Sequence, residues 1–237
     1  MAVDTNSVAA NLERVTQRIQ RAAKRAGRRE DDITIVAVSK GFPTETIRAA
    51  YDTGLRHFGE NRIQEFEAKH ETLVGFSDLI WHFIGHLQSN KANRAVHLFD
   101  RIDSVDSISL AHKLDVAATT EAKMLGVLIE VRLSDEETKS GAREGALSAL
   151  AASIQELPRL QLRGLMAIPP YSDDPENARF YFRRLRELRD GLCAQLGLPL
   201  PVLSMGMSTD FEIAIEEGAN EVRVGTALFG ERAQAKP

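Results

Sequence analysis

Lys40 is the residue whose place in this sequence most clearly suggests chemistry. In ITIVAVSKGFP it comes directly after an apolar run that predicts a buried strand over residues 33–38. One interpretation is a solvated lysine whose aliphatic stem covers the rim of the fold. The other is an amine that faces an apolar interior, loses part of its hydration and forms an imine with a carbonyl compound. The strand alone leaves both interpretations open.

Two later motifs place serine and glycine where an anion can bind. In SMGMSTDFEIAIEEG, Thr209 and Glu212 have the spacing of a capping box, so we expect Ser208 just before a helix with its hydroxyl free. In VRVGTALFG, Gly225 and Thr226 open a second short helix, and Gly225 lets the backbone approach a ligand closely. Each motif alone is an ordinary cap or turn. Two helix N-termini after adjacent strands together predict a phosphate site.

Arg223 adds a cation to this group. It lies two positions before Gly225, and side-chain alternation directs both residues to the same side of a strand. It is either paired with a carboxylate, such as Glu221 or Glu60, or it is a fixed cation in the mouth of the fold. An amine, a phosphate site and a cation between them suit a phosphorylated ring that carries an aldehyde.

Short apolar segments that alternate with amphipathic ones must position these residues. Eight of them have the composition of buried strands, centred near Ile35, Phe58, Phe83, Ile102, Ile129, Leu165, Leu203 and Val224. Eight strands separated by helices predict an α/β fold, the (β/α)8 TIM barrel, whose functional groups gather at the C-terminal ends of the strands. An open doubly wound sheet is the alternative, because a strand count does not show closure.

An amphipathic segment precedes the first strand. Its apolar positions recur at helical spacing, and Gly27 follows them: Val8, Leu12, Val15, Ile19, Ala22 and Ala26. We therefore expect an extra N-terminal helix. No linker or low-complexity tract interrupts the series, which favours one domain over residues 1–237.

The composition argues against several classes of partner. Thirty Lys and Arg against 34 Asp and Glu give a net charge of −4, which offers no general attraction to nucleic acid or to an anionic membrane. Cys193 is the single cysteine, so an internal disulfide is impossible. We see no apolar leader, no membrane span, and no metal-binding or nucleotide-binding motif, and we expect a cytoplasmic protein.

The chain resembles the pyridoxal phosphate homeostasis proteins, single-domain relatives of the alanine racemase barrel. The resemblance runs over about residues 33–232 in motifs that come in the same order, namely AVSKGFP, HFGENRIQE, WHFIGHLQSNK, LRGLMAI, SMGMSTDFEIAIEEGA and VRVGTALFGER. It implies an alanine racemase-like barrel, usually monomeric, that acts in vitamin B6 homeostasis and amino-acid balance without demonstrated catalysis. Its implied partners are pyridoxal 5′-phosphate (PLP), PLP-dependent apo-enzymes and free amino acids.

The resemblance also implies a role for individual residues. Lys40 would hold PLP as a covalent aldimine, and Arg223 would face the pyridine nitrogen. Ser208, Gly225 and Thr226 would form the phosphate cradle. The motifs that line the cofactor pocket further contain Asn61, His82 and Met205.

Three residues in predicted loops have open roles. His86 stands where many relatives have proline, and we expect it on the rim of the pocket. Tyr171, in IPPYSDDP, is expected to be a loop anchor packed on the two prolines. Lys139, in the polar loop SDEETKSG, is a candidate for a lid or transfer surface.

Two enzyme activities remain as alternatives. A low-rate PLP-dependent racemase is the first. An arginine at the pyridine nitrogen remains a hydrogen-bond donor, so it favours an unprotonated ring and a weaker electron sink. Alanine racemases share this arginine but add a tyrosine from a separate β domain, for which we see no counterpart. A Schiff-base aldolase is the second, and it would need acid–base groups at other strand ends that the sequence does not clearly show.

Overall fold

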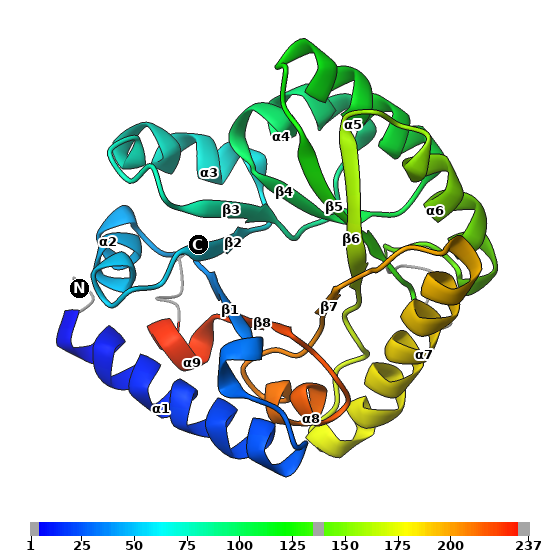
Figure 1. Ribbon diagram of the computed structural model, residues 1–237. Helices are drawn as coiled ribbons and strands as arrows, with labels where there is room; N and C mark the ends of the chain where they lie inside the picture. The colour runs from blue at the N-terminus through cyan, green and yellow to red at the C-terminus, as the bar shows by residue number, and fades with distance from the viewer. Residues whose placement is uncertain (1–4, 135–139, 232–237) are drawn as a thin grey trace.

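The fold is a closed barrel of eight parallel strands with helices on the outside (Figure 1). The computed structural model describes residues 5–134 and 140–231. The strands follow chain order around the barrel, and β8 pairs with β1 to close it. The predicted (β/α)8 architecture is therefore confirmed, and the open sheet is excluded.

The elements alternate as the sequence pattern predicts. The strands are β1 (Thr34–Val38), β2 (His57–Glu60), β3 (Ile80–Phe83), β4 (Arg101–Val105), β5 (Leu125–Glu130), β6 (Leu160–Met166), β7 (Val202–Ser204) and β8 (Glu221–Val224). The α-helices are α1 (Thr5–Arg25), α2 (Thr44–Asp52), α3 (Ile63–His70), α4 (Ala92–Leu98), α5 (Ile108–Thr120), α6 (Leu147–Gln155), α7 (Arg179–Leu196), α8 (Phe211–Glu216) and α9 (Thr226–Phe229). Short 3-10 turns are η1 (Glu30–Asp32), η2 (Glu71–Leu73), η3 (Ser89–Lys91), η4 (Glu144–Ala146) and η5 (Pro175–Ala178). All eight expected strand centres lie within these strands.

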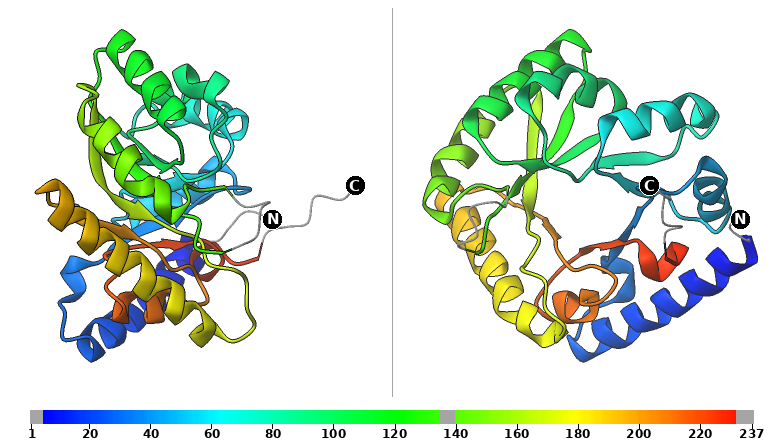
Figure 2. Two further views of the ribbon diagram at one scale, coloured as in Figure 1. Left: turned by 90° about the vertical axis from the view of Figure 1, so that its right-hand side faces the viewer. Right: turned by 180° about the vertical axis from the view of Figure 1, so that it is seen from behind.

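The expected N-terminal helix is α1, which lies across the outside of the barrel against α2, α8 and α9 (Figures 1 and 2). Its predicted apolar stripe is the side that packs, since Val8, Val15 and Ile19 are buried. Polar contacts add to this packing. The side-chain amide of Asn11 donates to the carbonyl of Leu228 at 2.7 Å. Packing thus attaches α1 to both α8 and α9, and the Asn11 hydrogen bond strengthens the contact with α9.

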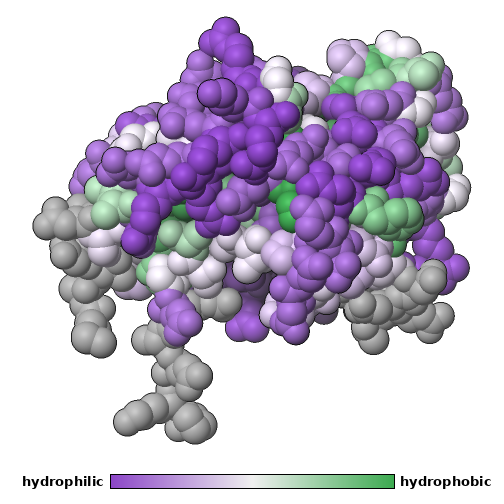
Figure 3. Space-filling model, turned by 90° about the horizontal axis from the view of Figure 1, so that it is seen from below, coloured by the Kyte–Doolittle hydropathy of each residue, from purple (hydrophilic) through white to green (hydrophobic). Residues whose placement is uncertain are grey.

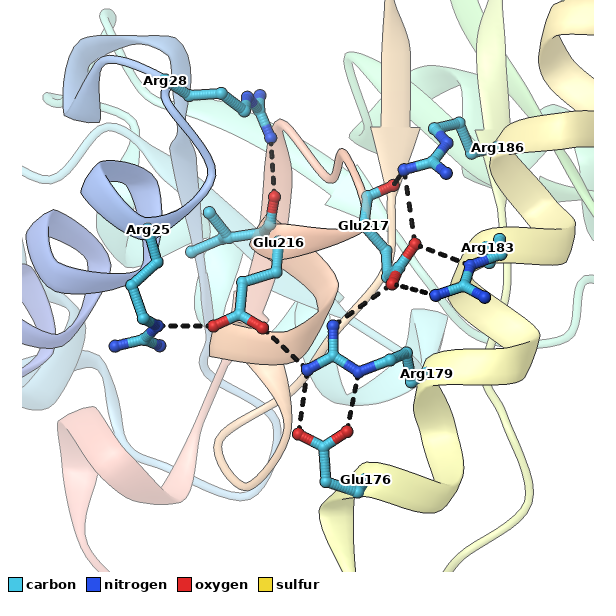
Figure 4. Close-up of polar contacts among 9 residues, drawn as sticks. Arg25, Arg28, Glu176, Arg179, Arg183, Arg186, Glu216 and Glu217 are labelled. Atoms are coloured by element: carbon cyan, nitrogen blue, oxygen red, sulfur yellow. Dashed lines mark hydrogen bonds and ion pairs between the residues drawn. The ribbon is translucent and has the colours of Figure 1, made fainter.

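Ion pairs join α1 and α7 to the end of α8 (Figure 4). Glu216 lies between Arg25 of α1, at 2.6 Å, and Arg179 of α7, at 2.7 Å. The neighbouring Glu217 accepts from Arg179 and Arg183 at 3.2 and 3.0 Å. Ion pairs near the surface each contribute about 0–1 kcal/mol, but a network that shares its carboxylates also fixes the geometry. It holds three segments distant in sequence in one arrangement.

The interior of the barrel contains charged side chains. Arg101 of β4 and Glu221 of β8 form an ion pair of 2.8 Å, although these strands are not neighbours in the sheet. Both side chains must therefore point into the barrel. Arg223 lies two residues beyond Glu221 on the same strand and points the same way, with 3% of its surface exposed.

The outer surface is mainly hydrophilic where Figure 3 shows it, with only small, separated hydrophobic patches. Among the described residues, no helix is both long enough and apolar enough to cross a bilayer.

Aromatic rings fill the space between α3 and the strands behind it. Phe66 of α3 is fully buried, and its ring centroid lies 4.4 Å from that of Trp81 and 4.7 Å from that of Phe99. Phe83 and Phe58 extend the cluster through Phe99 and Trp81. This packing fixes α3 against β3.

We expect Phe66→Ala to lower the free energy of unfolding by about 3–5 kcal/mol, because it removes a ring from a closely packed cluster. Urea denaturation followed by circular dichroism measures the change. The matched control is Phe180→Ala, since Phe180 is 70% exposed and its removal should change stability by no more than about 0.5 kcal/mol. A loss below about 1 kcal/mol for Phe66→Ala would contradict the role of this cluster.

Candidate functional site

A pocket of about 390 Å³ lies at the C-terminal ends of the strands. It is lined by the ends of β1, β5 and β8 and by the segments that follow β2, β3, β6 and β7. This end of a TIM barrel carries the functional site in characterised enzymes of the fold, and the volume suits a small molecule. The strand ends singled out from the sequence therefore meet in one place.

Most of the residues proposed from the sequence line this pocket. They are Lys40, Asn61, Ser208, Arg223, Gly225 and Thr226. Met205 is fully buried and His82 lies deeper in the barrel, and neither is among the described residues that line the pocket.

In one corner of the pocket, which we call the anion corner, backbone N–H groups gather around the Ser208 hydroxyl. The hydroxyl oxygen of Ser208 accepts hydrogen bonds from the backbone N–H groups of Gly225 and Ala227, at 3.3 and 3.2 Å. These N–H groups lie at the start of α9, where the helix itself provides no acceptor. An anionic oxygen is stabilised by donors of this kind. The predicted pairing of Ser208 with the segment after β8 is thus present as a contact.

The predicted capping box of α8 is wrong. The N-cap of α8 is Asp210, and Glu212 does not reach back to Thr209. Arg18 of α1 binds both oxygens of Glu212 instead, at 2.7 and 2.6 Å. The Ser208 hydroxyl, which the sequence predicts to be free, instead accepts from backbone N–H groups at the start of α9.

Arg223 is held rigidly in the pocket wall. Its Nη1 donates to the carbonyl and to the hydroxyl of Ser204, both at 2.8 Å, and its Nη2 donates to the carbonyl of Ala167 at 2.9 Å. Burial lowers the pKa of Arg223 from its usual value, and nearby carboxylates, Glu221 foremost, oppose this shift. A guanidinium stays protonated in proteins. Arg223 is therefore a fixed cation.

The carboxylates considered as partners of Arg223 bind elsewhere. Glu221 pairs with Arg101 at 2.8 Å, and Glu60 pairs with Lys69 at 2.8 Å. The first interpretation of Arg223, a structural ion pair with one of these acids, is therefore wrong.

His82 lies inside the barrel rather than in the pocket. It is fully buried, and its ring nitrogens lie 2.8 Å from an oxygen of Asp103 and 2.9 Å from Nδ1 of His57. The motif that contains His82 gives neither the direction of its side chain nor the depth at which the side chain lies. With both nitrogens engaged, His82 supports the barrel below the site.

The same interior cluster has the spacing of a metal site. His82, Asp103 and Glu221 each offer a ligand atom, and these atoms lie within 4.8 Å of one another. However, Arg101 forms ion pairs with Asp103 at 3.2 Å and with Glu221 at 2.8 Å. Because the guanidinium already pairs with both carboxylates, the geometry is that of a buried ion-pair cluster.

Glu130 is a pocket residue that the sequence analysis missed. It ends β5, is 6% exposed, and lines the pocket with an oxygen that accepts from the hydroxyl of Ser140 at 3.1 Å. Its other oxygen is buried without a hydrogen-bond partner, and burial raises the pKa of the carboxyl group. The sequence does carry a signal for Glu130, because the apolar run LGVLI is followed by an acid. In the same way, the apolar run before Lys40 is followed by a polar residue and a lysine.

Of the three predictions for loop residues, the structure confirms the one for His86, contradicts the one for Tyr171 and does not test the one for Lys139. His86 lines the pocket with a side chain that is 57% exposed, 3.5 Å from Asp106, so it lies on the rim as expected. Tyr171 is 86% exposed and donates to Asp173, so the expected packing on the prolines is wrong. Lys139 lies outside the described residues.

The surroundings of His57, whose ring contacts that of His82, predict a pH dependence of the free energy of unfolding. Burial, then the charges of His82 and Arg101, lower the pKa of His57 to about 4. Unfolded histidine titrates near about 6.5, so between these values the unfolded chain binds more protons than the folded one. The contribution of His57 is thus complete above about pH 6.5 and declines as the pH falls toward about 4.

We expect His57→Gln to flatten this decline, because glutamine does not titrate. Urea denaturation at about pH 7.5 and about pH 5 measures the fall in the free energy of unfolding between the two pH values. His97→Gln is the control, since the His97 side chain is 64% exposed. Equal declines for the two variants would show that His57 is not the group responsible.

Comparison with known proteins places the chain in a family. It matches the family model for the alanine racemase N-terminal domain over residues 10–233. It is 49% identical over 221 residues to the pyridoxal phosphate homeostasis protein of Aquifex aeolicus, covering 93% of this chain and 96% of that protein. It is 43% identical over 238 residues to the protein of the same name from Escherichia coli K12, covering 98% and 99%.

Solved structures agree with this match. PipY of Synechococcus elongatus, solved with PLP bound, is 40% identical with a TM-score of 0.80, covering 90% of this chain and 100% of that one. Alanine racemase from Corynebacterium glutamicum, 18% identical with a TM-score of 0.71 over 99% of this chain and 64% of that one, shares the fold. Since the curated relatives are matched over almost their whole length, the chain belongs to the family of pyridoxal phosphate homeostasis proteins.

Proposed function

We propose that this protein binds PLP as a Schiff base on Lys40 and acts in intracellular PLP homeostasis and amino-acid balance. One observation carries the proposal: the amine of Lys40, the anion corner at Ser208 and the buried cation of Arg223 line one pocket. The three features match the aldehyde, the phosphate and the ring of PLP. The names of the relatives and the PLP bound to PipY support the same ligand.

The pocket fits PLP in its size and in its donors. A volume of about 390 Å³ accommodates a substituted pyridine with a phosphate group. We propose that Ser208, Gly225 and Thr226 hold the phosphate, because the Ser208 hydroxyl and the N–H groups of Gly225 and Ala227 already converge on one another. We propose that Asn61, which also lines the pocket, contacts the ring.

Lys40 supplies the covalent attachment. Its neutral amine would attack the aldehyde carbon, a C=N bond would form, and the aldehyde oxygen would leave as water. Lys40 follows β1, whose Val36, Ala37 and Val38 are buried, so the residue emerges from an apolar strand.

Arg223 would face the ring nitrogen. PLP acts as an electron sink when that nitrogen is protonated, which a carboxylate partner favours. A guanidinium only donates, so Arg223 would keep the nitrogen unprotonated and the sink weak. This supports a protein that holds and exchanges PLP rather than one that transforms amino acids rapidly.

We further propose a cytoplasmic monomer with one domain over residues 1–237, which exchanges PLP with PLP-dependent apo-enzymes or with free amino acids. The mainly hydrophilic face in Figure 3 supports the monomer, because it offers no broad apolar surface there for self-association.

We expect Lys40→Ala to abolish the visible absorption band that PLP gives on binding and to weaken PLP binding by about tenfold or more, because the covalent bond is lost. Borohydride reduction of the wild-type protein with PLP, followed by peptide mapping, should find the label on Lys40. Lys113→Ala is the control, since Lys113 lies on α5 and contacts Ser89. If Lys40 were unlabelled, the proposed attachment would be wrong.

Glu130 is the observation that favours the low-rate racemase as a second candidate. A buried carboxyl group with a raised pKa in the pocket can hold a proton for transfer. Such activity would exchange the α-proton of an amino acid, whereas a carrier would only deliver PLP.

When the PLP-loaded protein is mixed with an apo-enzyme and an amino acid in deuterated buffer, we expect it to transfer PLP to the apo-enzyme without exchanging the α-proton of the amino acid. The apo-enzyme should gain activity, while mass spectrometry should find no deuterium at the α-carbon beyond the level given by free PLP. Exchange at a catalytic rate that Glu130→Gln removes would favour the racemase instead.

A further inference from the structure

Lys69 of α3 is buried, and among residues 5–134 and 140–231 no other lysine is. It lies next to the turn that carries Lys40. Its amine donates to the backbone carbonyl of Ser39 at 3.0 Å. It also contacts one oxygen each of Glu60 and Glu65, both at 2.8 Å. All three donor positions of the ammonium group are therefore occupied.

These contacts surround the backbone of Lys40 on both sides. On the N-terminal side, the Ser39 carbonyl accepts from Lys69, and the Ser39 hydroxyl donates to Glu60 at 2.8 Å. On the C-terminal side, the N–H of Gly41 donates to Glu65, through the same oxygen that binds Lys69. We call Lys69, Glu60 and Glu65 the Lys69 cluster.

The charges of the cluster depend on Lys69. Burial raises the pKa of Glu60, and the ammonium group of Lys69 opposes that shift. The second oxygen of Glu60 is buried without a hydrogen-bond partner. Without Lys69, the two carboxyl groups would remain close together with no cation between them, and at least one contact to the Lys40 turn would change.

Because Lys69 itself is occupied by three acceptors, it is not the amine that reacts. We propose that Lys69 is a positioning residue for Lys40: the Lys69 cluster fixes the Ser39–Gly41 backbone so that the Lys40 amine enters the pocket ready to form its bond. The inference rests on the proposed function and extends it, because nothing in the sequence motifs distinguishes Lys69 from a solvated helix lysine. The anion corner lies on the segments that follow β7 and β8 and does not use the cluster.

This separation gives a specific expectation for variants. Loss of the cluster should weaken the covalent step at Lys40 and spare binding of the phosphate. Pyridoxal, which lacks the phosphate, isolates the covalent step, and inorganic phosphate isolates the anion corner. The two probes together distinguish positioning of Lys40 from general damage to the pocket.

The experiment compares Lys69→Met and Glu65→Ala with Lys123→Met. Lys123 is a matched control, since its amine also donates to backbone carbonyls, those of Val96 and Phe99, but away from the pocket. Glu65→Ala guards against misfolding of Lys69→Met, because the Glu65 side chain is 28% exposed and its loss removes the Gly41 contact and one of the three Lys69 contacts. Circular dichroism verifies the fold of each variant.

We expect borohydride trapping of pyridoxal on Lys40 to fall about tenfold in Lys69→Met, and by a smaller factor in Glu65→Ala. Inorganic phosphate should bind as in the wild type, and Lys123→Met should trap pyridoxal normally even if its melting temperature falls. In the protein without PLP, amide hydrogen exchange at Gly41 should become faster in Glu65→Ala. This last readout needs no cofactor.

Two outcomes would overturn separate claims. Normal trapping in both folded cluster variants, with Lys40 labelled in the wild type, would refute the positioning role and leave the proposed function intact. Absence of label on Lys40 in the wild type would refute the proposed function itself, whatever the variants do.

Discussion

The pairing of β8 with β1 is the interaction on which the site depends. In this register Arg223 lies beside Val36 and Val224 beside Ala37, so Lys40 and the anion corner come from adjacent strands although they are distant in sequence. A shift by one residue would turn Arg223 out of the barrel. Closure of the barrel is thus also assembly of the pocket, and no local segment could form it alone.

Charges inside the barrel are tolerated because each has partners. Arg101 lies between two carboxylates, and Arg223 is held by Ser204 and Ala167. Removing one partner from a buried pair costs about 3–5 kcal/mol, since the remaining charge is then uncompensated. The polar interior is consequently intolerant of change, and it supports the pocket from below as a rigid floor. Lys69 applies the same principle beside Lys40, outside the barrel interior.

The sequence predicts the fold well because its signals are local. Strand centres, the apolar stripe of α1 and the gathering of Lys40, Ser208 and Arg223 at strand ends all follow from periodicity. Partners distant in sequence are not predicted in this way. Arg18 binds Glu212 only because α1 lies on α8, which overrides a plausible local capping box. Likewise, the motif that contains His82 gives neither the direction nor the depth of its side chain, and the amphipathic pattern of α3 does not show that Lys69 reaches the Ser39 carbonyl.

The position of α1 has a consequence for synthesis. This helix is synthesised before α8 and α9, yet its apolar stripe packs against both of them and Arg18 binds Glu212 of α8. Until α8 and α9 are made, α1 has only part of its native packing surface, the part on α2. Because Arg18 also binds the carbonyl of Ser208 at 3.2 Å, the anion corner matures at the moment when the two ends of the barrel meet. A nascent chain would therefore acquire ligand affinity in a single late step rather than gradually.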